Sequence, residues 1–156
     1  MKTQGKLETW PAVEAFVYGG DATFTLVSLK TGVRFTYKVR AKKEDVKNVV
    51  AKSEIVHFVN LLRGPDNMQD FAYMGVLRRD PARFFWTQAS GKVGRGAPAH
   101  KALLWMLDAM NCRRAVLGSS LEVWHEGRCA CCSRKLTVPE SIASGFGPFC
   151  LARRAA

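Results

Sequence analysis

One stretch of this chain constrains its fold more than any other. Residues 22–29, ATFTLVSL, and residues 33–40, VRFTYKVR, are separated by the short turn KTG, which is typical of a β-hairpin. In the second segment the apolar residues Val33, Phe35, Tyr37 and Val39 alternate with polar or basic residues. Because successive side chains of a strand point to opposite faces, the segment predicts a sheet with one apolar face and one cationic face.

The remaining segments predict further strands and two helices. Strand-like composition is found in residues 55–62, 70–77 and 83–88, whereas residues 41–54 are polar and predict a loop or short helix. Residues 11–18 and 98–118 predict helices, each with proline in the first turn and glycine at the end. We therefore expect an α+β fold, a curled antiparallel sheet of about five strands with two helices.

Length and composition suit one domain with a small appended module. The chain has 156 residues, and its hydrophobic share of 47% is enough for a core. It has no apolar run long enough to span a membrane and no apolar segment of the signal-peptide kind at residues 1–10, so we expect a cytoplasmic protein in a reducing compartment. We expect residues 1–118 to form a basic α+β body and residues 119–156 a zinc-binding module.

Three cysteines have the spacing of metal ligands. Cys129 and Cys132 form a CxxC pair, and Cys150 follows the turn-forming segment GFGP. A CxxC turn lets two thiolates converge on one cation, and a closed structural zinc site needs four such ligands. A redox dithiol or a set of unliganded thiols are the alternatives. The polar segment SRKLTVP after the pair does not match the helix that a redox motif would begin, so we favour zinc.

The fourth ligand is less clearly marked. Cys131 is too close to its neighbours to reach the same ion without strain, and Cys112 lies in a helical pattern, as a small core residue would. His125, four residues before Cys129, is the nearest imidazole and is our predicted fourth ligand. The alternatives are water, His100 and His57. The predicted metal ligands are therefore His125, Cys129, Cys132 and Cys150.

Residues 121–150, LEVWHEGRCACCSRKLTVPESIASGFGPFC, resemble a short zinc-motif family of phage, prophage and bacterial proteins, a domain of unknown function. The family pattern is CxxC, Gly-Arg-x-Leu-Thr, Pro-Glu-Ser and Gly-x-Gly-Pro-x-Cys. The chain departs from it where Ser133 replaces a glycine and where Cys131 occupies a variable position. The matching positions are Cys129, Cys132, Arg134, Leu136, Thr137, Pro139, Glu140, Ser141, Gly145, Gly147, Pro148 and Cys150.

This resemblance implies a treble-clef-like zinc knuckle and a phage origin, hence a bacterial host cell. Residues 22–118 resemble, more loosely, the domain that precedes the motif in some phage proteins. The resemblance implies no activity, because the family has none assigned.

The net charge of +11 favours a polyanionic partner, nucleic acid first. Most of it lies in residues 1–118, which hold 19 Lys and Arg against 10 Asp and Glu. A solvated outer face and a surface loop are the alternative interpretations of these cations, and Phe84, Phe85 and Trp86 could stack on bases or belong to the core. The predicted phosphate-binding residues are Arg34, Lys38, Arg40, Lys42, Lys43, Arg78, Arg79, Lys92 and Arg95.

No catalytic set is recognisable. Asp66, Asp70 and Asp80 lie near turns without the spacing of an acid–base or two-metal pair. We therefore predict a nucleic-acid-binding protein, of DNA or RNA, without catalytic activity. The alternative is an inhibitor or adaptor that binds a host nucleic-acid enzyme or a defence complex, as anti-CRISPR proteins do. A nuclease accessory or a fragment of a larger enzyme is a third, weaker possibility.

Overall fold

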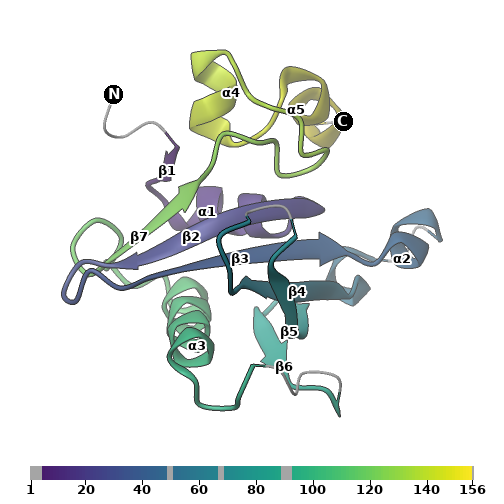
Figure 1. The fold of residues 1–156 in the computed structure, drawn as a ribbon. Helices are drawn as coiled ribbons and strands as arrows, with labels where there is room; N and C mark the ends of the chain where they lie inside the picture. The colour runs from purple at the N-terminus through teal and green to yellow at the C-terminus, as the bar shows by residue number, and fades with distance from the viewer. Residues whose placement is uncertain (1–4, 49–50, 67–68, 89–92, 156) are drawn as a thin grey trace.

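The computed structural model describes residues 5–48, 51–66, 69–88 and 93–155. Within these residues an antiparallel sheet of seven strands has the order β1-β7-β2-β3-β4-β5-β6, and it does not close into a barrel (Figure 1). The strands are β1 (Lys6–Leu7), β2 (Asp21–Ser28), β3 (Arg34–Ala41), β4 (His57–Leu62), β5 (Phe71–Arg78), β6 (Arg83–Phe85) and β7 (Leu121–His125). The predicted α+β class with an antiparallel sheet is confirmed, with more strands than the sequence predicts.

The predicted hairpin is formed by β2 and β3. Phe24 pairs with Tyr37 on one face of the sheet, and their rings stack with centroids 5.6 Å apart. On the other face the hydroxyls of Thr25 and Thr36 are hydrogen bonded at 2.7 Å. Val33 is the exception to the predicted alternation, because it lies in the turn before β3 and its side chain is 47% exposed.

The helices include the two predicted ones, which begin at or next to their prolines, but one of these two ends early. They are α1 (Trp10–Val17), α2 (Lys43–Lys47), the 3-10 helix η1 (Lys52–Glu54), α3 (Pro98–Asn111), α4 (Pro139–Ser144) and α5 (Pro148–Ala155). The N-cap of α1 is Thr9, whose hydroxyl accepts the Ala12 N–H at 3.3 Å. α3 stops well before Gly118, because Cys112 caps it and Arg113 takes a φ of 52° that no helix continues.

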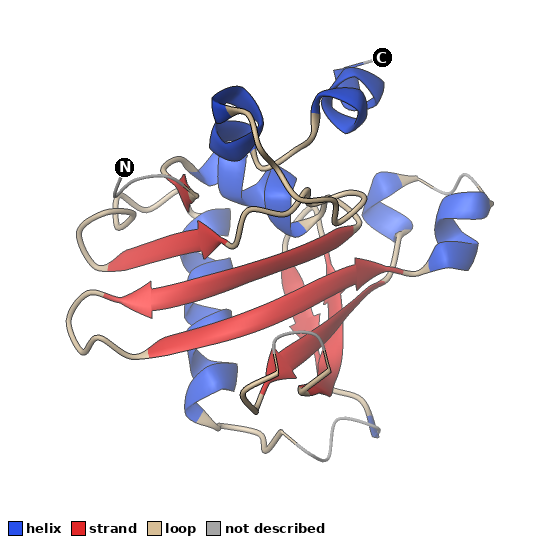
Figure 2. Cartoon of the chain, turned by 45° about the horizontal axis from the view of Figure 1, so that its top comes forward, coloured by secondary structure: helices blue, strands red, loops and turns tan. Residues whose placement is uncertain are grey.

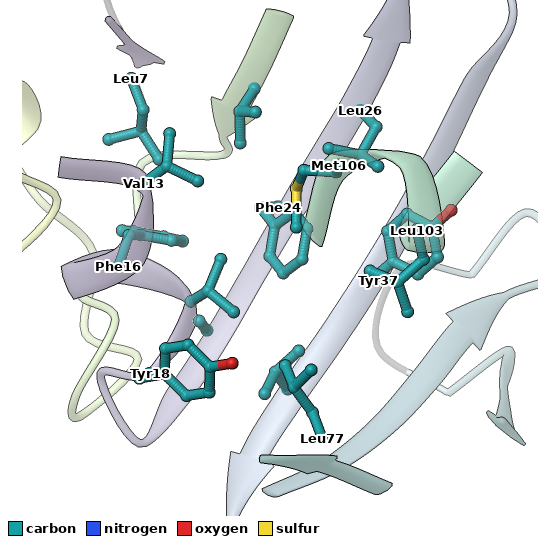
Figure 3. Packing of buried hydrophobic residues seen from close by; sticks show 14 of the residues in the cluster. Leu7, Val13, Phe16, Tyr18, Phe24, Leu26, Tyr37, Leu77, Leu103 and Met106 are labelled. Atoms are coloured by element: carbon teal, nitrogen blue, oxygen red, sulfur yellow. The ribbon is translucent and has the colours of Figure 1, made fainter. Parts of the chain in front are cut away.

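The core lies between the sheet and the helices α1 and α3, which cover the same face of the sheet (Figure 2). Phe24 and Leu26 of β2 meet Leu103 and Met106 of α3, and all four side chains are buried (Figure 3). The Tyr37 hydroxyl, buried in this layer, donates to the Ala99 carbonyl at 2.7 Å. Burial of these apolar side chains therefore holds α3 on the sheet.

Trp105 and Cys112 of this helical segment are apolar but exposed, and Cys112 was expected in the core. Trp105 is 41% exposed, and Cys112 is exposed at the helix end. Both follow from the single apolar stripe of the helix, which points Leu103, Met106 and Met110 at the sheet and leaves the other side to solvent.

Strand β7 lies within the predicted module, residues 119–156, but belongs to the sheet of the body. It lies between β1 and β2, so residues 121–125 are part of the sheet (Figure 1). We therefore call residues 5–125 the sheet body and residues 126–155 the thiol module. None of the helices that the structure describes is both long enough and apolar enough to cross a membrane.

Candidate functional site

Three thiols of the thiol module converge at one point. The Sγ atoms of Cys129, Cys132 and Cys150 all lie within 4.8 Å of one another. In a tetrahedral site with metal–sulfur bonds of about 2.3 Å, sulfur atoms are separated by about 3.8 Å. The predicted CxxC pair and the distant third cysteine are thus brought together as the ligands of one metal ion would be.

Local backbone geometry explains this convergence. After Cys129 the chain turns sharply at Ser133, which has a φ of 65°, and the Cys129 N–H donates to the Arg134 carbonyl at 2.9 Å. The turn presents both cysteines of the pair on one side. Pro148 begins α5, so that Cys150 lies in the first turn of that helix.

The thiols differ in their electrostatic surroundings. Burial raises the pKa of Cys129, but backbone N–H donors from Gly147, Cys132 and Cys131 outweigh it and hold the pKa below its usual value. Burial, together with the neighbouring thiols, raises the pKa of Cys150 to about 12. N–H donors directed at sulfur stabilise a thiolate, and a bound cation would supply the charge that the buried Cys150 thiolate needs. This donor set fits a metal that prefers sulfur ligands.

His125, the predicted fourth ligand, lies outside this cluster of three among the described residues. Both nitrogens of its buried ring have protein partners: Nδ1 accepts the Gly127 N–H at 3.0 Å, and Nε2–H donates to the Ile142 carbonyl at 2.6 Å. The ring also stacks on Phe16, with centroids 5.3 Å apart. With no free lone pair to offer, His125 joins β7 to α4 rather than holding the ion.

The other residues weighed for the fourth position are also placed elsewhere. His100 Nδ1 accepts the Gly96 N–H at 3.0 Å at the start of α3, and His57 is buried in β4 beside Tyr18. Cys131 is half-buried and lies outside the group of three, although its thiol reaches that of Cys150. Within the described part of the chain the candidate metal centre therefore has three protein ligands.

The thiol module is docked tightly against α1. The Phe16 ring lies edge-on to that of Phe146, with centroids 6.4 Å apart. Gly145, at a φ of 82°, has no room for a side chain, because a Cβ there would lie 2.4 Å from the Phe16 ring. The Asp21 N–H donates to the Ala130 carbonyl at 2.7 Å, which links the module to the start of β2.

Three of the predicted phosphate-binding cations alternate along β3 with the buried Tyr37 and Val39, so they lie on the face of the sheet opposite the core. No described helix covers this face, which is turned toward the viewer in Figure 2. We call this the open face. Arg34 and Arg40 are exposed and Lys38 is half-buried, all on β3. Arg40 pairs with Asp21 at 3.3 Å, and Lys38 Nζ lies 5.1 Å from the centroid of the Phe71 ring.

Aromatic side chains accompany these cations, and sequence reasoning missed them. Strand pairing puts Lys38 opposite Asn60 and Asn60 opposite Tyr73. Phe58 and Phe71 share this face, and the Phe58 and Tyr73 rings are 6.4 Å apart. The alternation of β4 is visible in the sequence. Which β5 residues lie opposite it depends on a register shift between Val59 and Asn60, and the sequence of a single strand does not reveal its pairing register.

The remaining predicted cations do not form one surface with these. Lys42 is 4.0 Å from Glu44 and, with the exposed Lys43, lies at the start of α2 beyond the end of β3. Arg78, at the end of β5, donates to the Glu54 carbonyl at 3.2 Å. Arg79 turns toward the core side, with its guanidinium 4.8 Å from the centroid of the Tyr18 ring.

Arg95, another of the predicted phosphate-binding residues, lies near the start of α3. The Arg95 guanidinium is 5.5 Å from the centroid of the Trp86 ring, and that ring and Phe84 pack around His100. Phe85, on β6 next to Phe84, is 45% exposed. Lys92, predicted beside Arg95, lies outside the described residues.

Comparisons with known proteins match the thiol module and little else. Residues 121–155 match a family described as "Family of unknown function (DUF6011)". Neither the comparison with curated proteins nor that with solved structures found a match. The similarity thus covers β7 and the metal centre, and it supports membership of an uncharacterised domain family for that segment.

Proposed function

We propose that this protein binds nucleic acid, without catalysis, across the open face of its sheet. The observation that carries the proposal is the pairing of cations with aromatic rings there, with Lys38 over Phe71 between Arg34 and Arg40. Cations hold phosphates, and flat rings stack on unpaired bases, at about 1–3 kcal/mol per base. Because stacking needs accessible bases, we expect single strands to bind more tightly than duplex.

Zinc is the proposed ion of the metal centre, with Cys129, Cys132 and Cys150 as ligands. The thiolate set suits zinc, and in a structural role the fourth position of the tetrahedral site is completed by a group other than these three thiolates, such as water. All five cysteines are free in the structure, which is what a reducing compartment such as a bacterial cytoplasm maintains. Elemental analysis of the purified protein tests the metal, and one zinc per chain is expected. The phage origin rests on the resemblance of the motif alone.

A salt series with labelled single-stranded DNA and RNA tests nucleic-acid binding. Lys38→Gln should weaken binding and lower the slope of log affinity against log salt by about one. Lys101→Gln is the matched control, because it removes the same charge from α3, which packs on the opposite face. Undetectable binding at low salt, or an equal effect of both variants, would contradict the proposal.

A second pair of measurements separates stacking from charge. Phe71→Leu should reduce affinity for single strands by about 1–3 kcal/mol while leaving the salt slope unchanged. A duplex of the same length serves as the comparison, and its affinity should change little. Equal losses for duplex and single strand would mean that the ring supports the fold of the face and does not stack on bases.

A further inference from the structure

A hollow opens on the thiol module, beside the thiols and away from the sheet. Its volume is about 550 Å³, and Cys132 and Cys150 reach its wall. One side is the segment from Arg134 to Val138, and the other is the first turns of α5. The docking of the module on α1 and the proposed nucleic-acid face use none of these residues.

The lining of this hollow is largely apolar and partly unprotected. Phe149 is 75% exposed, the highest value among the large hydrophobic side chains of the described residues. Val138 at 44% and Leu151 at 45% are also exposed close by, while Leu136 is buried at the base. An apolar group this open to water at the rim of a concavity is typical of a surface that a partner covers.

The charge around the hollow has one sign. Arg134, Lys135 and Arg153 line it, all exposed, and no Asp or Glu is among the lining residues. Among the described residues none of these three cations forms an ion pair, whereas seven ion pairs occur elsewhere in the structure. Unneutralised cations around an apolar hollow favour a partner with carboxylates around an apolar centre.

We propose that this hollow docks an acidic segment of a partner protein through one apolar anchor side chain. The anchor enters between Leu136 and Phe149, and carboxylates on either side of it meet Arg134, Lys135 and Arg153. A nucleic-acid strand fits less well, because the hollow offers one exposed aromatic ring and aliphatic walls instead of a series of rings. The site is separate from the open face, so the protein could hold a protein and a nucleic acid at once.

Selection of random displayed peptides on the immobilised full-length protein identifies the ligand class. We expect enrichment of peptides with Asp or Glu flanking Leu, Phe or Trp. An enriched peptide, synthesised with a fluorescent label, should lose at least about tenfold in affinity for Phe149→Ser and for Arg134→Glu combined with Lys135→Glu. Arg34→Glu, on the open face, is the matched control and should bind the peptide as wild type does.

Two controls make the outcome decisive. Thermal unfolding and metal content identify any variant that has lost its fold, and Arg153→Glu, which alters only the outer rim, is then the substitute. Selected peptides without acidic residues, or equal affinity of wild type and folded variants, would overturn the proposal. Displacement of the peptide by a short single-stranded oligonucleotide, with the same loss in the same variants, would overturn it in favour of nucleic acid. Failure of the salt series with Lys38→Gln would leave this site untouched.

Discussion

The sheet body and the thiol module achieve their structure by different means. In the body, side chains such as Phe24, Leu103 and Met106 are at most 1% exposed, and α3 alone has fourteen residues. In the module, α4 has six residues and α5 eight, shorter than the roughly 12–15 residues at which isolated helices become even marginally stable. The body is therefore stabilised by apolar burial, and the module depends on its docking and its thiols.

The two regions should therefore differ in how they respond to loss of the metal. The body should retain its fold without metal, since the apolar side chains that α3 and the sheet bury against each other do not include the thiols (Figure 3). The module should lose its fold before the body does, and with it the hollow beside Phe149. A nucleic-acid face on the stable part and a docking hollow on the metal-dependent part would then respond differently to chelation.

The largest effect should come from removing one thiol of the metal centre. Dividing the roughly 10–16 kcal/mol of a structural zinc site among three thiolates gives about 3–5 kcal/mol each, so Cys150→Ser should lower metal affinity on the order of 1,000-fold. Cys131→Ser is the matched control, because that thiol lies outside the group of three. Competition with a chromophoric chelator measures both. Equal losses in the two variants would make Cys131 a ligand.

The central hairpin of the body could be predicted from sequence, because residues 33–40 alternate between apolar and polar side chains and a short glycine turn joins them to the preceding strand. Strand β7 was missed, although buried Leu121, Val123 and His125 alternate with Glu122 and Trp124. The reason is length, since five residues after a long helical pattern do not stand out from a loop.

In the metal centre, sequence spacing predicted the local ligands but not the role of His125. Spacing identified Cys129 and Cys132, because CxxC geometry is local, and the turn-forming segment GFGP indicated Cys150. The role of His125 depended on the Ile142 carbonyl and the Phe16 ring, which come from distant parts of the chain. No spacing rule reveals that both nitrogens of a histidine already have partners.

A core substitution in the body tests whether its stability is independent of the metal centre. Leu103→Ala on α3 removes a fully buried side chain from the interface with the sheet and should lower the free energy of unfolding by about 3 kcal/mol. Metal affinity at temperatures where the body remains folded should not change. Chemical denaturation gives the first quantity and chelator competition the second. A joint loss of both would mean that body and module fold as one unit.

The pH dependence of the body provides a smaller effect. Burial lowers the pKa of His57 from 6.5 to about 4, although the Ile55 carbonyl, 3.3 Å from Nδ1, partly opposes it. The unfolded chain binds this proton more readily, so stability is complete above pH 6.5 and falls as the pH approaches 4. In wild type the free energy of unfolding should fall by up to about 3 kcal/mol, and His57→Gln should lack this contribution because it has no imidazole to protonate. Parallel stability profiles of the two proteins would contradict the burial of a neutral imidazole.

The smallest effect distinguishes the two possible roles of His125. As a residue that joins β7 to α4, it should contribute about 1–2 kcal/mol through its hydrogen bonds, so His125→Gln should lower the melting temperature of the module modestly. As a ligand, it should give a metal affinity at least about tenfold weaker when replaced, because even second-shell changes cost that much. Substitution with Co²⁺ separates the roles directly, because the visible spectrum of the ion reports its donor atoms. We expect the same spectrum in wild type and His125→Gln. A shifted spectrum would return the imidazole to the metal centre and remove the main difference between the sequence prediction and the structure.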